Sequence, residues 1–290
     1  MSEDIICNAP CFPSKGGLRC PSNPTNREDI RFGVDLGRVF YASLLDTERA
    51  RCHKTSPKVG LIGLSPGTTQ IDIFWRALHN GKSYGDAVIA ASYSGRGKQI
   101  SAMLDGLGII NYFGLRITDR ENIAANEGIW VSSVVACGTL DEAGSPRSSS
   151  IGPSSAAGRC AQQRFVADMA KHRERGLQAV ILFGKDGENE VGNVVRSTGL
   201  TVISLPHFGG SNGDEVELCS YPRGSFPACS EYINASHYDK YLEVWRRKKA
   251  SGRVVGDNPI SREKRDLRRA EKWRKINRLR EQLRRQGIPA

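Results

Sequence analysis

The sequence has no apolar run that approaches the ~18 residues needed to cross a membrane. Its N-terminus, MSEDIICNAPC, is acidic and lacks the apolar segment of a secretory signal peptide. Both absences argue against membrane-spanning and secreted classes. We therefore expect a cytoplasmic protein without a membrane partner, and we expect it to be a monomer.

The sequence also lacks the tight C-x2-C pairs that mark most zinc and iron–sulfur sites. It has eight cysteines, which without a secretion signal are expected to be free thiols or metal ligands rather than disulfides. Four of them lie in the first fifth of the chain, at Cys7, Cys11, Cys20 and Cys52. We expect no cofactor, and an iron–sulfur or zinc site at these four cysteines stays open as the alternative.

Acidic residues are outnumbered, with 42 Lys and Arg against 31 Asp and Glu and a formal net charge of +11. Such an excess favours a polyanionic partner such as nucleic acid. It is concentrated in residues 261–286, which hold twelve basic residues and four acidic ones. Apolar residues recur there every three or four positions, at Leu267, Ala270, Trp273, Ile276, Leu279 and Leu283. This spacing predicts a helix that docks one face, while arginines such as Arg268 and Arg269 contact DNA phosphates or simply face solvent.

Short apolar runs alternate with helical patterns along the middle of the chain. Strands are predicted at residues 59–64, 129–137, 179–184 and 201–206, and helices at residues 35–51, 97–107 and 160–175. Residues 138–159 read as loop. This order predicts an α/β fold with three α/β/α layers around a mostly parallel four-stranded sheet. We expect an irregular Cys-rich segment at 1–30, an α/β domain at 31–250, and a linker with a basic helix at 251–290.

In such a sheet, functional residues gather beyond the carboxyl ends of the strands. The first predicted strand ends in GLSPG, residues 63–67, which fits the G-x-S-x-G pattern of a serine hydrolase. Asp186 and His207 follow in the order of such a triad. However, the residue after Ser65 is Pro66, which has no backbone N–H to donate to an oxyanion. A hydrolase is therefore the weaker alternative.

Taken together, the strand ends resemble the uracil-DNA glycosylase superfamily over residues 58–212. The turn Gly63-Leu64-Ser65-Pro66-Gly67 resembles the first motif of that family, a strand ending in G-[IL]-x-P-G. The second strand ends in VSSVVAC and the next helix begins at Cys160, both typical of the family. Phe183-Gly184-Lys185 and Leu205-Pro206-His207 resemble its third and last motifs. The order of the motifs carries the resemblance.

The resemblance implies roles for these residues. Ser65 would position water and His207 would stabilise the departing base. Because a serine hydroxyl is a very weak base, a carboxylate from the following loop, Asp72 or Asp86, is the candidate for the missing base. An acid in such a loop is more often a helix cap or a solvated charge. The implied base pocket comprises Gly63, Pro66, Gly67, Tyr93, Phe74 and Asn212, with Tyr93 preferred over Phe74 as the aromatic platform.

Further residues are expected to contact DNA. The stretch Ser94 to Lys98 would hold a phosphate at a helix N-terminus through its amides, with help from Arg96 and Lys98. Phe208 would wedge into the base stack, and the glycines after it would allow close approach of the backbone. The complete set is Arg96, Lys98, Lys185, Phe208, Gly209, Gly210, Ser211, Arg268 and Arg269.

The expected function is therefore that of a monofunctional DNA glycosylase, which flips a base out of DNA and hydrolyses its N-glycosidic bond. Ser65 stands where the family often has Asp or Asn, which favours an altered or bulkier base over plain uracil. Base-excision repair and defence against phage DNA with modified bases are both open. The alternatives are a catalytically inactive nucleic-acid-binding protein of the same fold and the serine hydrolase.

Overall fold

The computed structural model describes residues 31–35, 38–41, 45–48, 50–140, 156–208, 213–220, 237–253, 259 and 261–290. The chain divides into two compact units. Unit 1 comprises Met1–Ser101 and Ile110–Phe208, and unit 2 comprises Ala102–Ile109 and Gly209–Ala290. The predicted boundary at residue 250 therefore differs from the structural one at Phe208, because α8 (Gly213–Cys219) packs with α11 (Arg262–Arg285) in unit 2. Within the described ranges, no helix combines the length and apolarity needed to cross a membrane.

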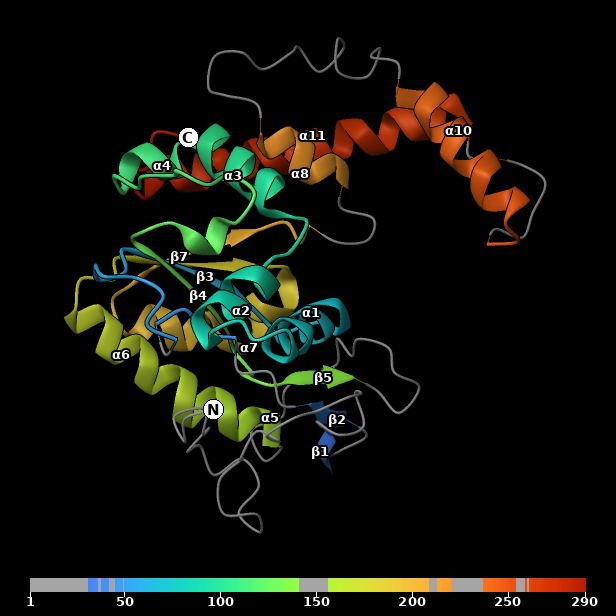
Figure 1. Ribbon diagram of the computed structural model, residues 1–290. Coiled ribbons are helices and arrows are strands. Elements are labelled where there is room, and N and C mark those ends of the chain that lie inside the picture. Colours follow the sequence, from blue (N-terminus) through green and yellow to red (C-terminus); the bar gives the residue numbers. More distant parts are fainter. Residues whose placement is uncertain are drawn as a thin grey trace. The chain divides into compact units, whose positions relative to one another are not determined.

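A four-stranded parallel sheet forms the centre of unit 1 (Figure 1). Its strands are β3 (Val59–Gly63), β4 (Ile129–Ser133), β6 (Ala179–Phe183) and β7 (Thr201–Leu205). Their order is β4-β3-β6-β7, and Val59 lies opposite both Ile129 and Ala179. The predicted α/β fold with a parallel sheet is confirmed. Short runs rich in Val, Ile and Leu form such strands because side chains on both faces are buried.

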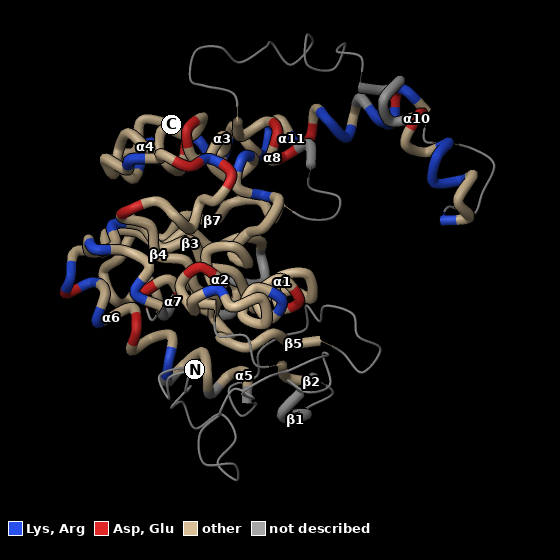
Figure 2. Tube along the Cα trace, in the orientation of Figure 1, with Lys and Arg blue, Asp and Glu red and all other residues tan. Residues whose placement is uncertain are grey.

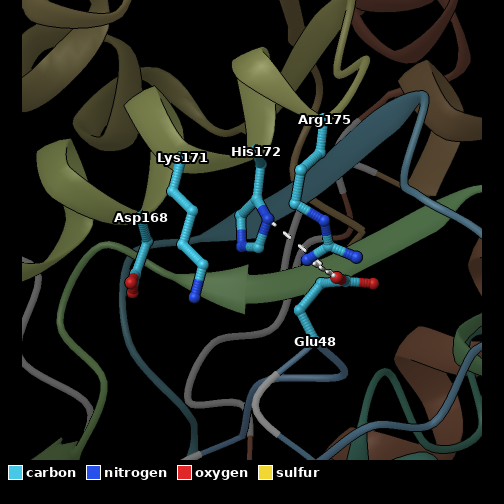
Figure 3. A pocket seen from close by; sticks show the side chains of 5 residues that line it. All are labelled: Glu48, Asp168, Lys171, His172 and Arg175. Atoms are coloured by element: carbon cyan, nitrogen blue, oxygen red, sulfur yellow. Dashed lines mark hydrogen bonds and ion pairs between the residues drawn. The ribbon is translucent and has the colours of Figure 1, made fainter.

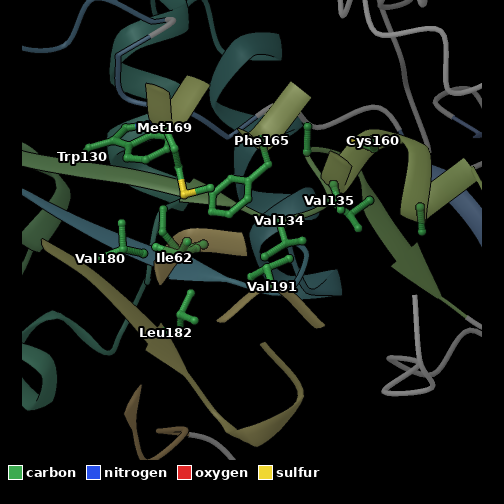
Figure 4. Close-up of a cluster of buried hydrophobic side chains, with 14 of the residues drawn as sticks. Ile62, Trp130, Val134, Val135, Cys160, Phe165, Met169, Val180, Leu182 and Val191 are labelled. Atoms are coloured by element: carbon green, nitrogen blue, oxygen red, sulfur yellow. The ribbon is translucent and has the colours of Figure 1, made fainter. Parts of the chain in front are cut away.

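Helices that follow β4 and β6 cover one face of the sheet (Figure 4). The chain passes through α5 (Ala156–Arg159), a π-helix at Cys160–Phe165 and α6 (Val166–Glu174) before β6, and through α7 (Lys185–Ser197) after it. Ile62, Val180 and Leu182 of the sheet share a buried cluster with residues of these helices, which are Phe165, Met169, Val191 and Val195. On the opposite face, Leu61, Ile181 and Ile203 are also buried. Both faces are therefore shielded from water.

The chain between β3 and β4 is largely helical. It contains α1 (Thr68–His79), α2 (Tyr84–Ala91), α3 (Gly97–Gly106), α4 (Ile109–Tyr112) and a 3₁₀ turn at Ile123–Ala125. α1 and α2 pack together through buried Ile71, Phe74, Trp75, Ala87 and Val88. Ser83 caps α2, since its Oγ accepts a hydrogen bond from the amide of Asp86 and donates one to the Asp86 carboxylate. Asp86 is thus a capping residue, and the predicted loop that held it is helical.

A small antiparallel sheet corrects two of the sequence predictions. Its strands are β1 (Arg31–Asp35), β2 (Arg38–Tyr41) and β5 (Gly138–Leu140), in the order β1-β2-β5. The helix predicted at 35–51 is wrong, and the predicted loop at 138–159 contains β5 and α5. Phe40 and Tyr41 explain the strand, because neighbouring side chains on a strand point to opposite faces. Phe40 joins the cluster under the parallel sheet, whereas Tyr41 joins the cluster of α1 and α2.

A buried polar network closes the free edge of β4. Val131 and Thr47 exchange two hydrogen bonds of 3.0 Å, one to the Thr47 side chain and one from its amide. The carboxylate of Asp46 accepts hydrogen bonds from Trp130 Nε1 at 3.2 Å and Ser132 Oγ at 2.7 Å. The guanidinium of Arg164 lies 4.0 Å from Asp46 and 3.1 Å from Asp168. Because Thr47 binds the backbone N–H and C=O of Val131, these groups cannot pair with another strand at the edge of the sheet.

Unit 2 is helical and contains α8, α10 (His237–Ala250), α11 and the segment 102–109. The predicted docking face of α11 is mostly confirmed, since Ala270, Trp273, Ile276 and Leu283 are buried. Leu267, which was assigned to that face, is exposed. Buried Arg280 shares the face and donates hydrogen bonds to the carbonyls of Gly106 at 3.0 Å and Cys219 at 3.5 Å.

We predict that Arg164→Met destabilises the protein by about 3–5 kcal/mol, because it leaves the buried carboxylate of Asp46 without its cation. Urea unfolding followed by tryptophan fluorescence measures this change. Arg116→Met, at an exposed position, is the matched control and should change the free energy of unfolding by less than about 0.5 kcal/mol. Equal changes in the free energy of unfolding for the two substitutions would show that the buried network around Arg164 does not stabilise the fold.

Candidate functional site

The order of the parallel strands places a topological switch point at the carboxyl ends of β3 and β6. The chain leaves β3 toward β4 on one side, and it leaves β6 toward β7 on the other. Adjacent strands whose connections run in opposite directions form a topological switch point, where open α/β sheets bind their ligands. The predicted site residue Gly63 ends β3, and Gly184, which belongs to the third motif, directly follows β6.

The turn after β3 is held on both sides. The amides of Val134 and Val135 donate to the carbonyls of Gly63 and Leu64, at 2.9 and 2.8 Å. The Oγ of Ser65 lies 3.0 Å from Oγ1 of Thr139, which is its hydrogen-bond partner. These contacts fix the direction of the turn. They also disfavour a hydrolase, since the hydroxyl of Ser65 is bound to another hydroxyl and Pro66 has no N–H.

Gly67 begins the helix that follows the turn, and Gly138 allows β5 to pack closely against it. Gly67 is the N-cap of α1, and its amide donates to the side chain of Gln70 at 3.0 Å. A Cβ at Gly138 would lie 2.0 Å from Cδ1 of Ile71 and 3.3 Å from the carbonyl oxygen of Pro66. Only glycine at position 138 therefore permits β5 to approach the buried Pro66.

Tyr93 lies in an aromatic cluster with Phe183 and Phe208. Its ring centroid is 5.5 Å from that of Phe183 and 5.2 Å from that of Phe208, and both pairs are edge to face. Phe183 and Phe208 are themselves 5.1 Å apart. The backbone of Tyr93 has φ +54°, which is uncommon for a residue with a side chain. The contacts of the ring hold this strained conformation.

The hydroxyl of Tyr93 is buried and finds no hydrogen-bond partner among the described residues. The side chain is only 6% exposed, and burial raises the pKa of Tyr93. A Cβ at Gly63 would lie 4.0 Å from this hydroxyl and 3.8 Å from Oγ of Ser133. The hydroxyl therefore lies near the ends of β3 and β4. The buried ring of Tyr93 offers no open face, so the predicted role of Tyr93 as a stacking platform is not supported.

His207 is exposed at the end of β7. Its imidazole stacks on the ring of Phe208, with centroids 4.7 Å apart and an interplanar angle of 21°. Gly184 has φ +84°, and a Cβ there would lie 3.5 Å from Cβ of His207. The structure thus brings four predicted residues into one neighbourhood, linking Gly63 to Tyr93, Tyr93 to Phe208 and Phe208 to His207.

Several predicted residues of unit 1 lie elsewhere or contact protein groups. Phe74 is fully buried in the cluster between α1 and α2, which leaves no ring face for a base and removes it as a platform. Asp72 was expected in a loop but lies in α1, half-buried. Arg96 is exposed and donates to Gln99 at 3.1 Å. Exposed Lys98 forms an ion pair of 2.6 Å with Glu121, which compensates its charge locally.

In unit 2, the two arginines predicted to contact DNA differ in exposure. Arg268 is exposed, as a phosphate contact requires. Arg269 is only 1% exposed and lies 3.9 Å from Glu217 of α8, so it is a structural residue and its assignment to DNA is corrected. Neighbouring residues on a helix point about 100° apart, which separates their roles.

Other predictions fall outside the described residues. These are Gly209, Gly210, Ser211 and Asn212, the side chain of Lys185, and three of the four candidate metal ligands, Cys7, Cys11 and Cys20. Cys52 is described, and its Sγ lies 3.6 Å from the carbonyl oxygen of Gly85. Burial, with the nearby Asp46 and Asp86, raises the pKa of Cys52 to about 12. In the metal-free protein this thiol therefore stays protonated at neutral pH.

A polar pocket that the sequence did not suggest lies between α6 and the turn after β2 (Figure 3). It is lined by Glu48, Asp168, Lys171, His172 and Arg175, whose side chains converge from both segments. Arg175 donates to Glu48 at 2.8 Å, and Nδ1 of the buried His172 lies 3.9 Å from the same carboxylate oxygen. The basic and acidic residues balance, so the pocket has no strong preference for an anion.

Burial shifts two groups in this pocket away from their charged forms. It lowers the pKa of His172, against the opposing effect of Asp46, and it raises the pKa of Glu48, against the effect of Arg175. A histidine whose pKa is lowered in the folded state binds fewer protons there than in the unfolded state. Its contribution to stability is therefore complete above the unfolded pKa of about 6.5 and is lost as the pH falls below it.

We predict that His172→Gln removes part of the acid sensitivity of folding. Wild type should lose stability between pH 7.5 and 5.5 more steeply than the variant, as measured by urea unfolding at each pH. Glu48 is present in both proteins, so its contribution to the pH dependence of stability cancels when the two curves are compared. His79→Gln, at an exposed position on α1, should keep the wild-type slope. Parallel curves for wild type and His172→Gln would disprove the assignment.

We predict that Tyr93→Phe stabilises the unliganded protein by about 1 kcal/mol, since it removes a buried hydroxyl that lacks a partner. Thermal or urea unfolding measures the difference. Tyr112→Phe is the control, because Tyr112 is 46% exposed and its hydroxyl can bind water. A loss of stability in Tyr93→Phe would mean that the hydroxyl already has a partner in the folded protein.

Comparisons of the chain with protein-family models, curated proteins and solved structures found no match. The geometry of the candidate site is therefore the evidence on which a functional proposal has to rest.

Proposed function

We propose that the protein is a DNA glycosylase that binds a damaged or modified base at the carboxyl edge of the parallel sheet and hydrolyses its N-glycosidic bond. The observation that carries the proposal is the set of contacts joining three strand ends at the switch point. Tyr93 faces Gly63, Phe208 packs on Tyr93, and His207 stacks on Phe208 beside Gly184. Gly63, Gly184 and His207 belong to motifs in which the sequence resembles the uracil-DNA glycosylase superfamily, whereas Tyr93 and Phe208 were predicted as contacts of the base and the DNA.

Aromatic side chains suit the binding of a flipped base. Taking a base out of the stack costs a few kcal/mol, which the protein must offset with new stacking and hydrogen bonds. Phe208 is partly exposed, and its stacked arrangement with His207 offers flat surfaces to a planar ring. Tyr93 supplies a hydroxyl without a partner among the described residues. A base carries both a π-face and polar edges, so it matches this combination.

Cleavage of the glycosidic bond leaves a negative charge on the departing base. His207 is exposed at the end of β7, where its imidazole can donate a hydrogen bond to that anion. α1 and α7 begin after the adjacent strands β3 and β6, and helix N-termini carry positive partial charge that favours an anion. Stabilising the leaving group in this way lowers the barrier to bond cleavage.

Ser65 would orient the attacking water rather than activate it. A hydroxyl can accept a hydrogen bond from water, but it does not readily take a proton at neutral pH. Asp72 lies within α1, beyond the turn that carries Ser65. A reaction in which the bond to the base breaks before water attacks needs little help from a general base. The proposal therefore assigns the larger effect to His207.

Oligonucleotides carrying uracil, hypoxanthine or modified cytosines test the proposal. Alkali converts abasic sites into strand breaks, so breaks that depend on the protein identify a glycosylase and its preferred base. A protein that binds these oligonucleotides without breaking any would be the inactive nucleic-acid-binding protein instead. Ester hydrolysis that disappears in Ser65→Ala would identify a serine hydrolase.

We predict that His207→Ala lowers single-turnover cleavage about 10²–10⁴-fold while DNA binding stays nearly unchanged. Loss of cleavage with retained binding is expected, because the imidazole acts on the departing base and not on the bound DNA. His79→Ala, at an exposed position on α1, is the matched control and should cleave like wild type. Unchanged cleavage in His207→Ala would remove this role.

A further inference from the structure

Helix α10 ends in a cluster of cations that we call the α10 basic end, and which comprises Arg246, Arg247, Lys248, Lys249 and Arg253. All five side chains are exposed. Figure 2 shows the Lys and Arg of this segment in blue. The only acidic residue from position 243 to 253 is Glu243, which lies 3.6 Å from Arg247 in an exposed pair. This surface therefore has a strong local positive charge.

The basic residues of α11 are arranged differently. Arg269 and Arg280 are buried and hold the helix within unit 2. Lys275 forms a 2.6 Å ion pair with Glu215, and Arg284 pairs with Glu281. Exposed acids, at Glu263, Glu271 and Glu281, interrupt the remaining cations. Although α11 holds more basic residues, several of them are buried or paired with acidic residues. The α10 basic end therefore has the less interrupted positive charge.

The fold alone does not account for the α10 basic end. Cations in the last turn of a helix interact favourably with its dipole, and this explains one or two of them. Adjacent cations repel one another, and Arg253 lies beyond the helix end at Ala250. Such a cluster is favourable when a partner with several closely spaced negative charges neutralises it. A nucleic-acid backbone has this spacing of charge.

The side chains of α10 favour phosphates of a nucleic acid over a membrane surface. A helix that lies on a membrane needs a continuous exposed apolar face beside its cations. Among the described side chains of α10, Val244 is the one large hydrophobic residue that is exposed, at 41%. Three of the five cations are arginines, whose guanidinium groups bind phosphate through two parallel hydrogen bonds.

We propose that the α10 basic end binds the phosphate backbone of DNA without reading its sequence. The identity of the polyanion rests on the proposed function, whereas the position of the surface rests on exposure and charge. Contacts to phosphates position a protein on DNA but do not select a base. The α10 basic end therefore supplies affinity, and selection of the base belongs to the strand ends of unit 1.

The test replaces Arg246, Arg247, Lys248 and Arg253 with glutamine in the full-length protein. The control replaces four exposed cations of α11, namely Arg262, Lys264, Arg274 and Arg278, in the same way. Glutamine keeps a similar helix propensity, and circular dichroism checks that both variants are folded. Binding to a short DNA duplex is measured by fluorescence anisotropy at several salt concentrations.

We predict that the slope of log affinity against log salt falls by about 0.9 for each phosphate that the protein no longer neutralises, so by about 3 to 4 in the α10 variant. The α11 variant should change the slope by less than half as much. The base preference in cleavage should be the same in both. An unchanged slope in the α10 variant, or a wild type that binds anionic phosphatidylglycerol vesicles but not DNA, would overturn the inference.

The same measurements distinguish a failure of this inference from a failure of the proposed glycosylase activity. If wild type binds the duplex with a steep salt dependence that the α10 variant lacks, but cleaves no modified base, the surface stands and the glycosylase does not. If wild type cleaves a modified base and the α10 variant keeps the full salt slope, the glycosylase stands and the surface is wrong.

Discussion

The buried guanidinium of Arg164 is the constraint on which the candidate site depends. It donates hydrogen bonds to the carbonyls of Ser133 and Val134, just where β4 ends, and it balances the carboxylates of Asp46 and Asp168. The segment it holds then binds the end of β3 through the amides of Val134 and Val135. A charge removed from water is costly unless hydrogen bonds and counter-charges offset the loss. Two carboxylates and two carbonyl oxygens do so for the terminal nitrogens of Arg164, whereas its buried Nε has no hydrogen-bond partner among the described residues. The network therefore specifies one arrangement of the turn after β3.

Two unusual features of unit 1 lie near the ends of β3 and β6. Tyr93 combines a strained backbone with a buried hydroxyl that has no partner among the described residues. Gly184 adopts a left-handed conformation against His207, where a side chain would be strained. Local conflicts of this kind persist when surrounding contacts compensate for them, and they are concentrated at functional sites. Their coincidence with the switch point of the sheet strengthens the proposal of a ligand site there.

Some basic residues of unit 2 are structural, and for others we propose a role in binding phosphate. Arginine has a long apolar stem and five donors, so it can fill a helix interface as well as bind phosphate. Arg280 does the first, since it binds the carbonyls of Gly106 and Cys219 within the unit. Removing α11 would therefore take buried Trp273 and Ile276 out of the core of unit 2, and loss of DNA binding in such a truncation would not identify a DNA contact. Substitution of exposed cations separates the two tasks.

The sequence by itself determined the parallel sheet, because runs such as VGLIG and AVILF are apolar on both faces and end in glycine or proline turns. It also determined α11, whose apolar spacing and Ser261 cap are local properties. Only the tertiary structure decided that residues 38–41 form a strand, since Phe40 and Tyr41 enter different cores. It likewise separated Arg268 from Arg269, which have the same chemistry in the sequence. The spacing of apolar residues in a segment predicts which face of that one helix or strand is buried. A functional site combines side chains from several elements. Their proximity depends on how the elements pack together, which the sequence of a single segment does not specify.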